Sequence, residues 1–298
     1  LKNGKDAAFH AETGPLKAAD LIAALPDSVL PNKKDVSAQG ELSFGLDGAA
    51  QFGAGKPVIR YKGAFEVRNM TAAVKGFPKK IDRFQSAVDI TENVLTFRDT
   101  EVRIGQSRAA LSGTVSHYLE KPELALKTLG SLNMNDITDA LPLFQENKPS
   151  GKVDFDLAAE GNPSQKITGV KLSGRLALNA LTMSLPKTLK NPAVLNGTVQ
   201  ISPDAAKIAP LAIKTGKSNI TINGELSQYQ NLLPGSNGVP SVLKGMITST
   251  LLDLNDMLVI PENAPIIKPW DLNEPLRNLP VPPALRAEVG VRLGPVRF

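Results

Sequence analysis

Apolar and polar residues alternate with a period of two along much of the chain. The segments 42–46 (LSFGL), 153–157 (VDFDL) and 220–223 (ITIN) are three examples. Because successive side chains of a strand point to opposite faces, this pattern predicts strands with one apolar and one solvated face. Segments with a helical period are short and few. The sequence therefore predicts a mainly β protein of repeated antiparallel strands.

Pairs of a small polar residue and glycine punctuate these alternating runs. Asn196-Gly197 lies between two apolar runs, and Ser112-Gly113 and Asn223-Gly224 lie inside others. Asn-Gly between apolar runs is typical of a tight hairpin turn, because both residues tolerate a positive φ. We therefore expect these pairs to mark turns.

The sequence repeats itself after 111 residues, without a gap from Gly40 to Tyr118. Apolar positions match in kind and in phase across the two copies, so the match is not compositional. The identical pairs at this offset include Gly40/Gly151, Phe44/Phe155, Leu46/Leu157, Gly63/Gly174, Gly105/Gly216, Ser107/Ser218, Gly113/Gly224 and Tyr118/Tyr229. The chain thus contains two consecutive copies of one unit.

A second element recurs where the units join. Asp20, Asp136 and Asp256 each lie in a short segment that ends at a proline, which predicts one or two helical turns capped by Asn or Asp side chains. The third copy comes nine residues later than the repeat predicts, and the loop at 231–238 accounts for the extra length. We expect the end of a preceding unit at 1–39, units at 40–150 and 151–266, and the start of a following unit at 267–298.

The composition excludes several kinds of site. The 298 residues include 24 glycines, 23 prolines, two histidines and no cysteine, with a net charge of +5. Disulfides and cysteine-based sites are excluded, and the histidines leave little for a metal centre. The mild charge argues against nucleic-acid binding. The basic cluster Lys75, Lys79, Lys80 and Arg83 is interpreted as a solvated loop, with anionic headgroups as the alternative partner.

The sequence offers no catalytic constellation. The segments around Lys56 and Lys217 lack the residues of a phosphate-binding loop, and the recurring aspartates stand singly. His117 has no partner at a spacing that a nucleophile would need. One tryptophan and three tyrosines are few for a carbohydrate-acting enzyme. We expect a protein without catalytic residues, metal or cofactor.

The joints and two glycine-containing runs resemble the C-terminal repeat region of AsmA-like proteins. The matching segments are 132–137, 250–257, 174–178, 195–199 and 216–224. The resemblance implies a bridge-like lipid-transfer architecture, in which a long curved sheet forms a groove with an apolar lining. It also implies a periplasmic protein of Gram-negative-type bacteria, anchored in the inner membrane and serving outer-membrane biogenesis. The ends of the chain are those expected of a segment from such an array, and its membrane contacts would lie in other regions.

The resemblance implies that phospholipid acyl chains are the partner of the apolar stripes. The candidate contact residues are Phe44, Leu46, Phe65, Val67, Leu111, Val115, Phe155, Leu157, Leu176, Leu178, Ile222 and Leu226. The same alternation also fits an ordinary packed core, because most half-buried sheets pack on another layer. A structural or scaffolding β-repeat protein without lipid is therefore the alternative function.

Overall fold

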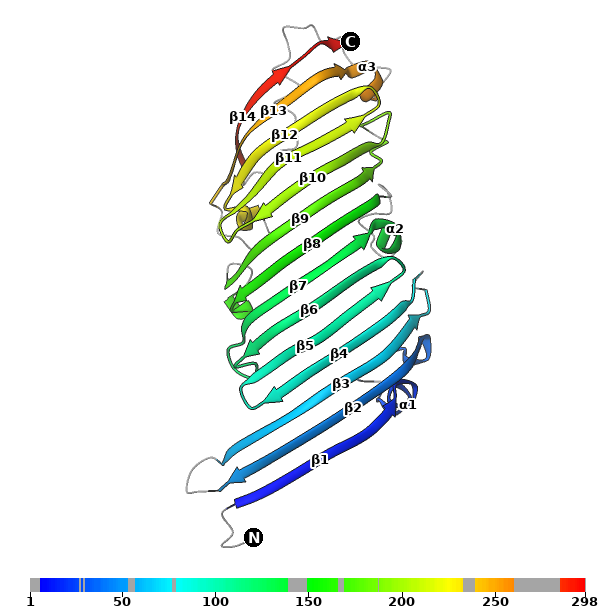
Figure 1. The fold of residues 1–298 in the computed structure, drawn as a ribbon, viewed down its shortest axis with the longest axis vertical. Coiled ribbons are helices and arrows are strands. Elements are labelled where there is room, and N and C mark those ends of the chain that lie inside the picture. The colour runs from blue at the N-terminus through cyan, green and yellow to red at the C-terminus, as the bar shows by residue number, and fades with distance from the viewer. Residues whose placement is uncertain are drawn as a thin grey trace. The chain divides into compact units, whose positions relative to one another are not determined.

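The computed structural model describes residues 6–26, 28, 30–52, 57–76, 79–138, 149–165, 169–186, 188–232, 239–259 and 285–297. The chain is mainly β, with short helices, as the alternating pattern predicts. Hydrogen-bonded neighbours follow chain order from β1 to β14 (Figure 1). The chain divides into two compact units, Leu1–Pro142 with Val153–Gly174, and Leu143–Lys152 with Arg175–Phe298.

The first unit contains the strands up to β8 and the start of β9. Its elements are β1 (Asp6–Lys17), α1 (Ala18–Ala24), a 3-10 turn (Lys33–Asp35), β2 (Val36–Gln51), β3 (Val58–Val74), β4 (Ile81–Thr91), β5 (Val94–Ile104), β6 (Ser107–Ser116), β7 (Glu123–Asn133), α2 (Met134–Ile137), β8 (Ser150–Gly161) and a second 3-10 turn (Pro163–Gln165). Both α1 and α2 lie at the same end of this unit's strands (Figure 1).

The second unit contains most of β9 and the elements that follow it. These are β9 (Val170–Met183), β10 (Ala193–Ile201), β11 (Ala205–Thr215), β12 (Ser218–Ser227), a 3-10 turn (Tyr229–Leu232), β13 (Ser241–Asp253), α3 (Leu254–Met257), β14 (Leu285–Leu293) and β15 (Val296–Arg297). The predicted boundary between 266 and 267 lies outside the described residues.

The pairing is antiparallel from β1 to β7 and from β10 to β13. The last pairs differ from the prediction, because β14 and β15 both run parallel to β13. Ser241 pairs with Leu285, so β13 and β14 start at the same end of the sheet. A parallel neighbour needs a crossover of a dozen or more residues, and the chain between α3 and β14 is long enough.

The predicted repeat is confirmed in the backbone. A shift of 111 residues maps β5 onto β11 and β6 onto β12 without any change in their ends. Left-handed residues recur at the same offset, in the pairs Asn69 (φ 49°) with Ala180 (φ 47°) and His117 (φ 50°) with Gln228 (φ 55°). Helix α3 follows α2 by 120 residues rather than 111, which places the nine extra residues between β12 and β13.

The predicted turns at Asn196-Gly197, Ser112-Gly113 and Asn223-Gly224 are wrong, because all three pairs lie within strands. Their glycines serve close strand approach instead. A Cβ on Gly113 would lie 2.1 Å from the carbonyl oxygen of Ala125, and one on Gly197 would lie 2.5 Å from that of Pro210. The same two-residue signal therefore reports tight backbone contact inside the sheet.

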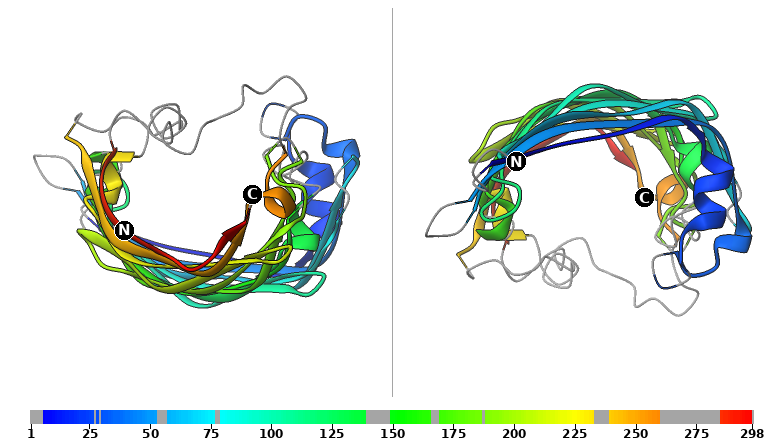
Figure 2. Two further views of the ribbon diagram at one scale, coloured as in Figure 1. Left: turned by 90° about the horizontal axis from the view of Figure 1, so that it is seen from above. Right: turned by 90° about the horizontal axis from the view of Figure 1, so that it is seen from below.

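The strands of each unit bend along their length (Figure 2). Register shifts accompany the bending in the pairs β2–β3, β3–β4, β4–β5, β5–β6 and β11–β12. An extra residue on one strand kinks it and increases its twist. Few apolar side chains are buried in the described part of the chain, and they are mostly small: Ala18, Ala38, Ala50, Val67, Val88, Met134 and Ala193.

Candidate functional site

A row of large apolar side chains crosses four neighbouring strands of the first unit. Phe44 of β2 pairs with Phe65 of β3, which pairs with Val88 of β4, which pairs with Phe97 of β5. Directly paired residues of antiparallel strands place their side chains on the same face. We call this side the apolar face of the first unit.

The remaining predicted contact residues of strands β2 to β6 belong to this face as well. A second row of paired residues begins at Leu46, two residues from Phe44. It passes through Gly63, Ile90 and Leu95 to Val115 of β6. Val67 and Leu111 lie two and four residues from members of these rows on β3 and β6. The register thus brings Phe44, Leu46, Phe65, Val67, Leu111 and Val115 onto one face.

Phe155 extends the apolar face to β8. A Cβ on Gly130 of β7 would lie 2.5 Å from the ring of Phe155. Gly130 pairs with Ala109 and shares its face with Leu126, four residues earlier on β7. The ring of Phe155 therefore covers a glycine of the neighbouring strand on the apolar side. Leu157, two residues further along β8, shares the face of Phe155.

The second unit has an apolar face of its own. Ile222 of β12 pairs with Leu211 of β11 and with Ile247 of β13, and Ile247 pairs with Val291 of β14. Leu226 lies on the same face of β12 and pairs with Leu243. The predicted residues Leu176 and Leu178 occupy alternate positions of β9. All four predicted residues of this unit are half-buried.

The opposite face of the first unit is charged. Asp89 forms an ion pair there with Arg98 at 2.8 Å, and Glu101 forms one with Arg103 at 2.6 Å. Each of these four charged side chains is between 23% and 51% exposed, so the pairs stay in contact with water. The two faces therefore differ sharply in polarity.

The apolar face is neither closed nor fully exposed. Eleven of the twelve predicted contact residues are half-buried, and Val67 alone among them is buried, at 4% exposure. In the part of the chain that the structure describes, the sheet forms a single layer with short helices at the strand ends. A minor part of the surface of these apolar side chains is therefore left to solvent or to a ligand.

Several residues of this face were not among the predicted ones. Val88, Phe97, Leu95 and Leu126 lie in the same paired rows. The alternation in β4 and β7 marks Val88 and Leu126 as apolar positions. The register shift between β4 and β5 hides the phase of Phe97 and Leu95, because an extra residue exchanges the two faces.

Two of the recurring aspartates, Asp136 and Asp256, have a different role from the predicted helix capping. The Asn133 side chain accepts from the amide of Asn135, and the Asp253 side chain accepts from that of Asp256, so these residues cap α2 and α3. Asp136 instead accepts from the amides of Gln106 and Ser107, and Asp256 from that of Lys217. A carboxylate one helical turn past the cap points away from the helix's free amides and reaches the neighbouring hairpin.

Tyr118 follows the left-handed residue His117, as Tyr229 follows Gln228. The Tyr118 hydroxyl donates to the carbonyl oxygen of Thr91 at 2.8 Å and lies 2.6 Å from the Tyr61 hydroxyl. Burial and the Tyr61 hydrogen bond raise the pKa of Tyr118 to about 12. Burial, followed by the nearby Asp204, also raises the pKa of Tyr229. The tyrosines thus occupy corresponding turns of the two copies.

Within the described ranges, no group of three or more His, Asp or Glu side chains is arranged to hold a metal ion. None of the helices described is long and apolar enough to cross a membrane. Comparisons with protein-family models, with curated proteins and with solved structures find no match. The chain's class is thus defined by its fold: a β-repeat protein with an apolar sheet face in each unit.

Proposed function

We propose that the apolar faces bind the acyl chains of phospholipids, and that the chain is a non-catalytic segment of an AsmA-like envelope protein that moves phospholipid between the inner and outer membranes. One observation supports the proposal above the others. The rows through Phe44 and Leu46 are apolar on strand after strand, while the opposite face carries ion pairs such as Asp89 with Arg98 and Glu101 with Arg103.

The half-burial of this face favours a lipid over water as its usual neighbour. Monomeric proteins rarely expose apolar patches larger than a few hundred Å² without a binding function. An acyl chain on such a patch gains about 0.8 kcal/mol for each CH₂ that it removes from water. Side chains such as Phe65 and Leu111 offer no directional polar group to a ligand. The surface therefore suits chains of differing length and leaves the headgroup in water.

A periplasmic location and a role in outer-membrane biogenesis belong to this proposal. They rest on the resemblance of the joints and glycine runs to the AsmA-like repeat region. The repeated strand order between α1 and α2 and between α2 and α3 supports the same architecture. Successive repeats extend an apolar face without adding a catalytic group, which is what lipid transfer requires.

Site-specific photocrosslinking tests the proposal on two adjacent residues of β6. Leu111 lies on the apolar face, and Ala110 pairs with Glu101 and Leu129 on the charged face. A photoreactive phenylalanine at Leu111 is expected to form adducts with phospholipid in cells, detected by mass spectrometry of the purified protein. The same probe at the exposed Ala110 is the matched control and is expected to form none.

The alternative is a scaffolding β-repeat protein whose apolar face is covered by protein. In that case the probe at Leu111 would crosslink to a peptide rather than to lipid, and native mass spectrometry would find no phospholipid. Equal lipid adducts at Leu111 and Ala110 would also contradict the proposal, because they would report unspecific membrane contact.

A further inference from the structure

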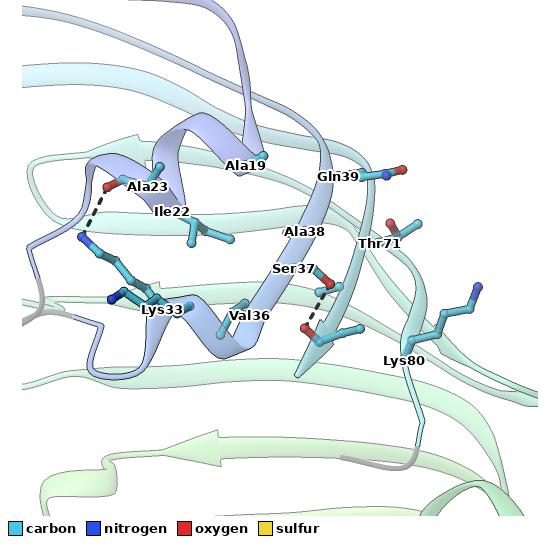
Figure 3. A pocket seen from close by; sticks show the side chains of 13 residues that line it. Ala19, Ile22, Ala23, Lys33, Val36, Ser37, Ala38, Gln39, Thr71 and Lys80 are labelled. Atoms are coloured by element: carbon cyan, nitrogen blue, oxygen red, sulfur yellow. Dashed lines mark hydrogen bonds between the residues drawn. The ribbon is translucent and has the colours of Figure 1, made fainter. Parts of the chain in front are cut away.

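A pocket of about 720 Å³ lies beside helix α1 in the first unit. Its apolar part comes from Ile22 of α1, Val36 and Ala38 of β2, and the alanines at 72 and 73 of β3. Figure 3 shows Ile22 extending from the helix toward the strands. Ala38 is buried and Ala72 pairs with it, so small side chains leave the space open.

The polar lining of this pocket is cationic. Lys33, Lys34 and Lys80 line it, and no carboxylate stands among the described lining residues. Lys33 donates to the carbonyl oxygens of Ala23 and Leu25 at 3.3 and 2.7 Å, so it fixes the end of α1. Figure 3 places Lys33 and Lys80 at opposite ends of the pocket.

Two of these lysines are available to a ligand. Lys80 lies 3.7 Å from Asp82, and its side chain is 68% exposed, which makes the pair weak. Lys34 has no ion-pair partner among the described residues. By contrast Lys79, from the same basic cluster, pairs with the buried Asp136 at 3.6 Å. No described carboxylate therefore neutralises the charge of Lys34 by an ion pair.

Lys80 is not part of the repeated framework. The glycines and left-handed residues recur after 111 residues, because the fold requires them. Asn191 stands at the position that corresponds to Lys80 in the second copy. Strand geometry alone thus does not account for a cation at position 80.

We propose that the pocket beside α1 binds the phosphate-bearing headgroup of an anionic phospholipid, with Lys34 as the main phosphate partner and Lys80 as a second cation. This inference rests on the proposed function, because the acyl chains would lie on the adjacent apolar face. Ala38 lines the pocket, and Leu42, which pairs with Val67 of the apolar face, lies four residues further along the same side of β2, about 13 Å at strand spacing. Lysine binds phosphate as a point charge, so the site selects charge rather than a particular headgroup.

Calorimetry on the purified protein tests the site with short-chain lipids below their micelle concentration. Dihexanoyl phosphatidylglycerol is expected to bind, and the double substitution Lys34→Gln with Lys80→Gln is expected to weaken its affinity at least tenfold. Lys33 stays unchanged, because it holds α1. Lys62→Gln with Lys127→Gln, two exposed lysines outside the pocket, is the matched control and should change the affinity less than twofold.

Each other outcome overturns a defined part of the inference. Unchanged affinity in the double variant refutes the lysine site but leaves acyl binding by the apolar face intact. Inorganic phosphate that binds as tightly as the lipid makes the pocket a free-phosphate site. Equal affinity for dihexanoyl phosphatidylcholine refutes selection of anionic headgroups. Failure of every lipid to bind the unmodified protein refutes the proposed function itself.

Discussion

The carboxylate of Asp136 lies against Gly105, in the turn that joins β5 to β6. A Cβ on Gly105 would lie 2.3 Å from Asp136 Oδ1, and the glycine has a φ of +58°. Gly216 and Asp256 repeat the arrangement, with a φ of +53° and a corresponding distance of 2.0 Å. Helix α2 therefore holds the turn between β5 and β6, and helix α3 holds the turn between β11 and β12.

Asp136→Asn is expected to destabilise the protein. Asp136 is 6% exposed, and its Oδ2 accepts from Gln106 N at 2.8 Å, Ser107 N at 2.9 Å and Ser107 Oγ at 3.0 Å. Hydrogen bonds to a charged group contribute about 1.5–3 kcal/mol each, and an amide retains part of them. We expect a loss of about 2–3 kcal/mol in the free energy of unfolding, measured by urea denaturation.

The control for Asp136 is Asp89→Asn, on the charged face. Asp89 is 45% exposed and pairs with Arg98, so its loss should cost less than about 1 kcal/mol. Equal destabilisation by the two substitutions would contradict a special role for the contact between α2 and the hairpin turn.

Gly105→Ala tests the same turn from the opposite side. Alanine at a positive φ is strained, and its methyl group would force the Asp136 carboxylate away from the two amides. We expect a decrease of about 2 kcal/mol or more in stability, measured by thermal or urea unfolding. Gly45→Ala is the control, because nothing lies within 4 Å of its Cβ position and its φ is not positive. If Gly105→Ala left the stability unchanged, the turn would have adapted to the extra methyl group, which would contradict this prediction.

Much of this fold could be predicted from the sequence, because period-two alternation and the 111-residue repeat report directly on strands and their succession. The role of Asp136 could not, because its partners at Gln106 and Ser107 are 30 and 29 residues away. The position of Gly197 inside a strand could not be predicted either, because an Asn-Gly pair suits a turn as well as a close contact between strands. The six contact residues from Phe44 to Val115 share a face because their strands alternate regularly, whereas Phe97 follows a register shift that the sequence does not mark.

Tyr118 is expected to ionise at a higher pH than an ordinary tyrosine. Its pKa is raised from 10 to about 12, so the folded state favours the neutral phenol. The contribution of this phenol to the free energy of unfolding is complete below about pH 10 and is lost as the pH rises from about 10 to about 12. Ultraviolet titration of phenolate absorbance should show Tyr118 among the late-titrating tyrosines, together with Tyr229, whose pKa is also raised. Tyr118→Phe should remove the part of the late absorbance change that belongs to one tyrosine. If the late change is undiminished in the variant, the hydrogen bonds to Thr91 and Tyr61 do not hold the phenol neutral.

A charge on the apolar face should abolish lipid binding without unfolding the protein. Val115 pairs with Leu95 and Leu124 on that face, whereas the neighbouring Thr114 pairs with Thr96 and Ala125 on the charged face. Val115→Lys places an ammonium group where acyl chains would lie, and an unpaired charge in an apolar contact is strongly disfavoured.

The measurement for Val115→Lys is phospholipid co-purifying with the protein, quantified by mass spectrometry per mole of folded protein. Thr114→Lys adds the same charge on the same strand, one residue away, to the face that already carries ion pairs. We expect at least a tenfold loss of lipid for Val115→Lys and less than a twofold change for Thr114→Lys, with both proteins retaining their β circular dichroism. If the two variants lose lipid equally, the effect of charge is global, and the apolar face is not where the acyl chains lie.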